Sequence, residues 1–278
     1  MKLLKYSFLF ILAILTACSS DDEETIVNEL DGLTKIQEFT NDTHIIELYN
    51  STGALEQGYN AISLRFKDKN TNEYEKNATV SWMPVMHMAT MNHSCPKSEV
   101  AKTALKETLY NGYIVFQMAQ NETEYWDLKI DYTINGILYT ATENINVPAS
   151  AKRKVTSFMG SDNKKYLIAL IDPSSPKVAL NDVTFGLYKM ESMMSFPIVD
   201  NYKIKIDPRM PSMGNHTSPN NVDLTQSADK LYHGKLSLTM TGYWKINLQL
   251  LNELDEVLKG EVVTEENPAS SIFLEIEF

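Results

Sequence analysis

The stretch YWDLKI, residues 125–130, places Trp126, Leu128 and Ile130 at every second position, between polar residues. The stretch YWKINLQL, residues 243–250, continues the same pattern for eight residues. This alternation is typical of a half-buried β-strand, because successive side chains of a strand point to opposite faces of the sheet. Further alternating segments occur at residues 62–66, 114–118, 202–206, 236–240 and 272–278. The chain is therefore predicted to be all-β.

The two Tyr-Trp stretches belong to an internal repeat. A Met-Pro-x-Met motif occurs at residues 83–86 and again at residues 210–213. In both copies a Tyr-x-Gly motif follows, and a methionine comes six residues after its glycine, at Met118 and Met240. Motifs in the same order indicate a duplication. About 115 residues per copy, with many short strands, favour two tandem immunoglobulin-like β-sandwich domains.

The predicted domains are residues 39–148 and residues 155–278. Residues 149–154 between them include the basic cluster KRK at 152–154. Such a short polar segment is typical of a linker, and a solvated hinge is the expected role of its charges.

The first residues have the layout of a secretory signal peptide, predicted for residues 1–17. Lys2 and Lys5 precede an apolar run that is too short to span a bilayer. LTAC, residues 15–18, resembles the bacterial lipobox, which implies a lipid on Cys18; the alternative is an ordinary signal that ends in cysteine. Residues 18–38, with SSDDEE at 19–24, are expected to be an acidic tether. The expected location is the outer membrane of the cell envelope, on its periplasmic face or at the cell surface.

The overall composition excludes several classes of function. There are 36 acidic against 25 basic residues, a formal net charge of −11, whereas a nucleic-acid binder needs a basic face. With Cys18 lipidated, Cys95 is the only remaining thiol, so no intramolecular disulfide is expected. No nucleophile elbow, His-Glu-x-x-His motif or phosphate-binding glycine loop occurs, so we do not expect an enzyme.

The segment WMPVMHMATMNHSCP, residues 82–96, packs four methionines, two histidines and one cysteine into fifteen residues. Thioether and thiolate sulfurs suit Cu(I), imidazole suits both copper states, and the carboxylates that Ca²⁺ or Mg²⁺ prefer are absent. We expect a loop at the end of a strand, with Met86 and Met88 on one side and His87 on the other. The candidate metal ligands are Met83, Met86, His87, Met88, Met91, His93 and Cys95 in the first copy, and Met210, Met213 and His216 in the second.

Other methionines and histidines are weaker candidates. Methionine is a common filler of irregular cores. Packing is therefore favoured over metal binding for Met118, Met240 and Met190. His44 and His233 have no soft neighbour in the sequence and are expected to be surface or core residues.

MPSMGNH at residues 210–216, Tyr-x-Gly at 232–234 and MTGYW at 240–244 resemble the YtkA-like domain family. The resemblance covers much of residues 178–250 and implies a small extracytoplasmic immunoglobulin-like β-sandwich, with a copper role by association. The first copy is similar, but it lacks a glycine that matches Gly242 and has four extra residues before Trp126. The counterparts that the resemblance implies for Met210, Met213 and His216 are Met83, Met86 and either His87 or His93.

The sequence thus favours a lipid-anchored extracytoplasmic protein that captures, buffers or hands on copper, as Cu(I), through Met/His clusters. A membrane copper transporter or assembly protein is the expected partner. The alternative is a non-enzymatic structural or adhesion module that binds no metal and uses its methionines for packing. The position of residues 86–93 in the structure should distinguish these two hypotheses. A convergent exposed loop favours metal binding, and a buried strand favours packing.

Overall fold

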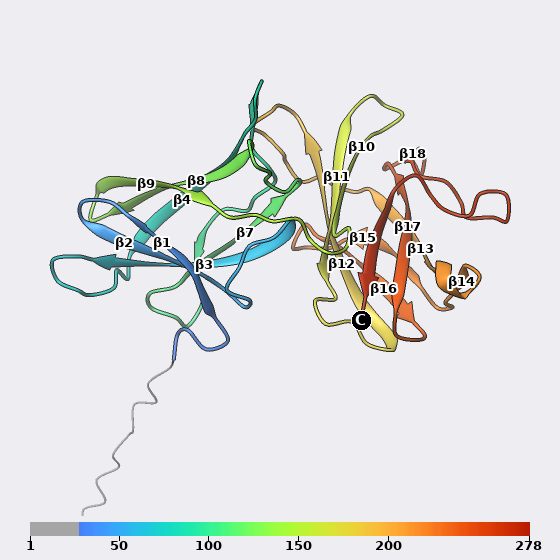
Figure 1. Cartoon of the computed structure of the whole chain (residues 1–278), viewed down its shortest axis with the longest axis horizontal. Coiled ribbons are helices and arrows are strands. Elements are labelled where there is room, and N and C mark those ends of the chain that lie inside the picture. The colour runs from blue at the N-terminus through green and yellow to red at the C-terminus, as the bar shows by residue number, and fades with distance from the viewer. Residues whose placement is uncertain (1–27) are drawn as a thin grey trace, which may run out of the picture.

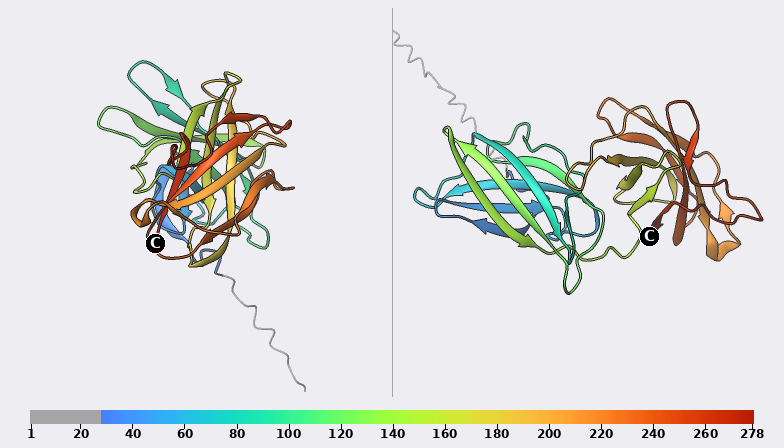
Figure 2. Two further views of the ribbon diagram at one scale, coloured as in Figure 1. Left: turned by 90° about the vertical axis from the view of Figure 1, so that its right-hand side faces the viewer. Right: turned by 90° about the horizontal axis from the view of Figure 1, so that it is seen from above.

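A computed structural model of the chain describes residues 28–278, and the all-β prediction is confirmed. Two sandwich-like units follow one another along the chain and lie side by side (Figures 1 and 2). Within the described residues, no helix is long and apolar enough to cross a membrane.

Residues 28–148 form the first unit, which consists of two antiparallel sheets with strand orders β1-β2-β3-β7-β6 and β5-β4-β8-β9. The trio β2-β3-β7 packs against the trio β4-β8-β9, in the chain order that strands A-B-E and C-F-G have in an immunoglobulin sandwich. The strands of this unit are β1 (Thr34–Thr40), β2 (His44–Asn50), β3 (Gly58–Asp68), β4 (Ala78–His87), β5 (Asn92–His93), β6 (Ala101–Lys102), β7 (Tyr110–Phe116), β8 (Tyr125–Ile134) and β9 (Ile137–Ile145).

Residues 155–278 form the second unit, a ten-stranded sheet with a main path β10-β11-β12-β16-β15-β13-β17-β18. Strands β14 and β19 pair with β13 and β17, and β15 pairs with both β16 and β13, so that it joins the two halves. The elements are β10 (Val155–Met159), β11 (Lys165–Asp172), β12 (Ala179–Met190), β13 (Lys203–Met210), the 3-10 turn η1 (Pro211–Met213), β14 (His216–Thr217), β15 (Val222–Gln226), β16 (Tyr232–Leu238), β17 (Tyr243–Leu251), β18 (Val257–Lys259) and β19 (Phe273–Glu277).

The alternating stretches that predict strands line the two cores. In β8, Trp126, Leu128 and Ile130 are fully buried, and the polar residues between them face outward. In β17, Trp244 and Ile246 are buried in the same way within the second core. Burial of one face of each sheet is the driving force for this arrangement, since apolar side chains leave water on that side only.

The predicted boundaries need one correction. Strand β1 starts at Thr34 and pairs with β2, so residues 34–38 belong to the first sandwich and not to the predicted tether, 18–38. Apolar and polar residues alternate poorly in this segment. Its extended conformation depends on pairing with β2. The predicted signal peptide, 1–17, Cys18 and the tether as far as residue 27 lie outside the described residues.

The two units contact each other through a small apolar cluster. Val115 of β7, Leu167 of β11 and Tyr188 of β12 are buried together in it. The basic segment between the units is not a free hinge, because Lys154 forms an ion pair of 2.5 Å with Glu56. Both charges are partly exposed, so the pair contributes little stability by itself, and the apolar cluster carries more of the contact.

Leu128→Ala should lower the free energy of unfolding by about 2–5 kcal/mol, because it leaves a cavity at a fully buried position between the two sheets. Urea denaturation followed by circular dichroism measures the change. The neighbouring exposed substitution Lys129→Ala is the control and should cost less than about 1 kcal/mol. Equal effects of the two substitutions would contradict this packing.

Candidate metal centre

The register of strand β4 brings three inward side chains together at one end of the first sandwich. Met86 lies opposite His93 of β5 and also opposite Trp126 of β8. Directly opposed residues of an antiparallel pair share a face and have Cβ atoms about 4.5–5.5 Å apart. All three side chains are almost completely buried, with exposures of 0% for Met86, 5% for His93 and 0% for Trp126. They form the inner wall of the candidate centre.

Met118 completes this group from the other sheet. It follows β7, and its carbonyl oxygen accepts a 3.0 Å hydrogen bond from the indole nitrogen of Trp126. Its thioether sulfur lies 3.3 Å from Nε2 of His93. Met88, two residues beyond Met86, is half-buried against the same core. Three thioethers and one imidazole therefore gather at this end of the unit.

The hydrogen bonds of His93 indicate which ring nitrogen is free. Nδ1 lies 2.7 Å from the carbonyl oxygen of Ser94, and because a carbonyl only accepts, Nδ1 carries the hydrogen. The amide nitrogen of Gln117 lies 3.1 Å from the same Nδ1, and its Oε1 is buried without a partner among the described residues. Exchanging the two amide atoms would place the acceptor Oε1, in place of a second donor, beside the hydrogen on Nδ1. Nε2 therefore carries the free lone pair, on the side of the ring that faces the Met118 sulfur. Metal-binding histidines are commonly oriented by a hydrogen bond at the other ring nitrogen, as Nδ1 of His93 is here.

His87 lies on the opposite face of β4, as the strand alternation predicts, and does not join this group. Its Nε2 lies 2.7 Å from a carboxylate oxygen of Asp127, and its ring stacks on Tyr125 at 4.8 Å. Met83 also faces outward, and its sulfur accepts a 3.4 Å hydrogen bond from the hydroxyl of Ser94. These two predicted ligands are separated from His93 by the sheet itself.

The loop that is expected at the end of a strand within residues 82–96 is much shorter in the structure. Strand β4 extends to His87 and β5 covers residues 92–93, which leaves only residues 88–91 as a turn. Pro84 does not break β4, because the two-residue strand β5 leaves most of β4 at the edge of its sheet, where a missing backbone donor is tolerated. Met91 in the turn is 46% exposed. The segment is thus neither a free loop nor a wholly buried strand.

Cys95 is misplaced in the predicted ligand set. It is 2% exposed within the first core, and burial raises the pKa of its thiol well above the ordinary value. A metal binds the thiolate, which this apolar environment disfavours. Cys95 therefore packs as a small apolar residue.

The second unit repeats the pairing of a methionine with a histidine and the hydrogen bond from a tryptophan to a methionine carbonyl. Met210 lies opposite His216 of β14, and the indole nitrogen of Trp244 donates a 3.0 Å hydrogen bond to the carbonyl of Met240. The β13–β17 register ends at the pair of Arg209 with Lys245, and one further step sets Met210 against Trp244. On this basis four residues of the first unit have equivalents in the second: Met86, His93, Met118 and Trp126 correspond to Met210, His216, Met240 and Trp244. The resemblance implies that Met83 is the counterpart of Met210, and this is wrong by three residues. The two Met-Pro-x-Met motifs match in sequence, but the strands match when Trp126 is placed on Trp244, and Met86 then takes the position of Met210.

The predicted ligands of the second copy do not converge. Met210 is 3% exposed in the core, whereas Met213 in η1 is 56% exposed. His216 is also exposed. Gly214 adopts the left-handed backbone conformation, with φ of 63°, that the turn after η1 requires. The second unit keeps the buried methionine and the tryptophan of the first, but its histidine is exposed to solvent.

Sequence reasoning missed the contact of Met118 with His93. The repeated spacing from Tyr-x-Gly to Met118 and Met240 was the signal that both methionines occupy a fixed place beside the tryptophan. Met193, from the loop after β12, is a further neighbour, since its carbonyl oxygen accepts a 2.8 Å hydrogen bond from the backbone nitrogen of Ser94. Met193 and Met194 are 42% and 43% exposed beside this junction of the two units.

No protein-family model matches the chain, and no curated protein matches it. The resemblance to the YtkA-like family stays a prediction.

The burial of Cys95 leads to a simple expectation about its reactivity. In a Cys18→Ser variant, Cys95 is the only thiol of the chain. At pH 8 the folded protein should react with a disulfide reagent such as DTNB far more slowly than the urea-unfolded protein, because the thiol is buried and its pKa is raised. Release of the coloured product over time measures the rate. Similar rates in the folded and unfolded states would show that Cys95 is accessible and available to a metal.

Proposed function

We propose that this protein is a lipid-anchored copper-binding protein of the cell envelope, which takes up Cu(I) at His93, Met118, Met86 and Met88. The observation that carries the proposal is the 3.3 Å approach of His93 Nε2 to the sulfur of Met118, with Met86 directly opposite His93.

The chemistry of the donors supports Cu(I) over other ions. Thioethers are soft ligands that bind Cu(I), and a neutral imidazole adds a stronger donor. Among the described residues, the polar contacts of the His93 ring are to Ser94, Gln117 and Met118, so no carboxylate competes for its Nε2. Thioethers need no deprotonation, so their contribution to Cu(I) binding should persist at low pH, whereas that of the imidazole should weaken.

Exposed methionines beside the centre support a role in transfer. Met91 lies in the turn between β4 and β5. Met193 lies across the junction of the two units, where its backbone carbonyl accepts a hydrogen bond from Ser94, the residue after His93. Both side chains are more than two-fifths exposed, whereas Met86 is fully buried. We infer that an ion is captured at these exposed thioethers, passes to the buried ones and leaves by the same route.

The proposed anchor is a lipid on Cys18 after removal of residues 1–17. It would hold the protein at the outer membrane, beside a membrane copper transporter or assembly protein that receives the ion. The protein's role would then be to capture, buffer or hand on copper and would involve no catalysis.

Met118→Leu and His93→Ala should each weaken Cu(I) binding at least about tenfold, because each removes one donor from the centre. Leucine preserves most of the volume of Met118, so the fold should persist. Competition with a chromophoric Cu(I) chelator, without oxygen and under reducing conditions, measures the affinity and should give one tightly bound ion per chain.

Met159→Leu is the matched control, since Met159 is 55% exposed on β10 in the other unit. It should bind Cu(I) as the parent protein does. Unchanged affinity in Met118→Leu and His93→Ala would exclude this centre. No competition by the parent protein would favour the alternative, an adhesion or structural module without metal.

Lipidation can be tested in cells with an alkyne-bearing fatty acid. The parent protein should become labelled and sediment with membranes, whereas Cys18→Ser should be unlabelled and remain in the supernatant, because the second thiol of the chain is buried. Cys95→Ala is the control and should remain labelled. Label that persists in Cys18→Ser would contradict the proposed anchor.

A further inference from the structure

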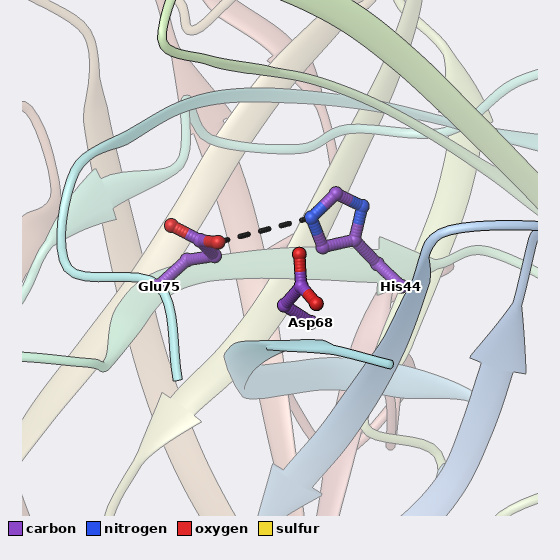
Figure 3. A group of neighbouring side chains, drawn as sticks. All are labelled: His44, Asp68 and Glu75. Carbon is purple, nitrogen blue, oxygen red and sulfur yellow. Dashed lines mark ion pairs between the residues drawn. The ribbon is translucent and has the colours of Figure 1, made fainter. Parts of the chain in front are cut away.

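Three residues with metal-binding side chains meet at the end of the first sandwich remote from His93. His44 begins β2 and lies opposite Asp68, the last residue of β3. Glu75 lies in the segment that returns from β3, where its backbone nitrogen bonds to the carbonyl of Phe66 at 2.8 Å. One ligand atom from each of His44, Asp68 and Glu75 lies within 4.8 Å of the others, and Figure 3 shows the two carboxylates directed toward the imidazole.

The imidazole of His44 is fixed so that Nε2 faces the carboxylates. Its Nδ1 lies 2.8 Å from the hydroxyl oxygen of Thr43, and that hydroxyl can donate to Oδ1 of Asn41 at 3.2 Å. The hydroxyl therefore accepts from Nδ1, which leaves the lone pair on Nε2. The ring is held edge-on by Tyr132 and Tyr139, at 5.4 and 4.7 Å between centroids.

Nε2 of His44 makes no hydrogen bond with any described residue, although the side chain is only 3% exposed. Its distance to Oε1 of Glu75 is 3.9 Å, too long for a hydrogen bond. Two ligand atoms that each lie about 2.0–2.2 Å from a zinc ion are separated by roughly 3–4 Å. The gap between the imidazole and the carboxylate thus fits a bridging cation better than a direct contact.

Among residues 28–278, no lysine or arginine neutralises the negative charge of the two carboxylates, and the only basic group paired with either of them is His44 itself. Within that range, neither Asp68 nor Glu75 forms an ion pair with a lysine or arginine. Asp68 is also held in place, because its Oδ1 accepts hydrogen bonds from the backbone nitrogens of Asn70 and Thr71 at 2.6 and 2.9 Å. A divalent cation would balance both charges and pair with the free lone pair of His44.

We propose that His44, Asp68 and Glu75 form a Zn²⁺ site. One imidazole and two carboxylates are the nitrogen and oxygen donors that zinc accepts, whereas Cu(I) prefers the sulfur donors near His93. Three protein ligands leave the fourth tetrahedral position open to water or to an external ligand.

This site is separate from the proposed copper centre. Tyr132, against which His44 packs, follows Trp126 by six residues on β8, so the two sites lie roughly 20 Å apart along the strand. The inference does not depend on the proposed function, and either can fail alone.

Calorimetric titration of the purified protein with Zn²⁺ tests the site. We expect one ion per chain, with affinity reduced at least about tenfold in Asp68→Asn and in Glu75→Gln. Both substitutions keep the shape of the side chain, and the amide oxygen introduced by Asp68→Asn can still accept the two backbone hydrogen bonds. Glu73→Gln, an exposed carboxylate of the same loop, is the matched control and should bind as the parent does.

X-ray absorption of the zinc-loaded protein provides a second readout and should show nitrogen and oxygen neighbours without sulfur. Zinc affinity that is unchanged in Asp68→Asn and Glu75→Gln, or no binding by the parent protein, would overturn the site. Sulfur among the atoms that coordinate the zinc would also overturn it, since zinc would then occupy the His93–Met118 centre. His93→Ala should leave zinc binding unchanged, and Glu75→Gln should leave Cu(I) binding unchanged, which keeps the two proposals distinguishable.

Discussion

The register of β4 between its two neighbours is the constraint on which the candidate copper centre depends. It places Met86 opposite both His93 and Trp126, and ten consecutive pairs with β8, from Ala78 to His87, hold it there. A slip of one residue would turn Met86 outward and His87 inward, because strand side chains alternate with a period of two. The hydrogen bond from Trp126 to the Met118 carbonyl then fixes the position of the second sulfur.

The duplication shows which parts of this arrangement belong to the fold and which are particular to the first unit. Both units bury a methionine beside a tryptophan and tie that tryptophan to a second methionine, so this group is part of the common core. Only in the first unit does the paired histidine lie inside, where its Nε2 meets a sulfur. In the second unit His216 is exposed, and the turn at η1 carries Met213 into solvent. The buried position of His93 therefore distinguishes the candidate copper centre of the first unit from the methionine–tryptophan packing that both units share.

The two ends of the first sandwich differ in their chemistry. At one end, thioethers surround His93 within an apolar core. At the other end, His44 lies beside the carboxylates of Asp68 and Glu75. Soft and hard donors bind different ions, so the two proposed sites should not compete for one metal. The same long strand, β8, supports both ends through Trp126 and Tyr132, whose rings contact His93 and His44 edge-on.

The sequence by itself determined the all-β class, the presence of a repeat, and the division of Met86 and His87 between two faces. These features follow from local alternation and from spacing, which neighbouring residues express without reference to the rest of the chain. The tertiary structure alone decided that Met118 meets His93, that Cys95 is buried, that Met86 and not Met83 is the equivalent of Met210, and that His44 faces Asp68 and Glu75. Each of these depends on which distant strands pair and in which register, and a one-residue shift in pairing changes the answer while the local pattern stays the same.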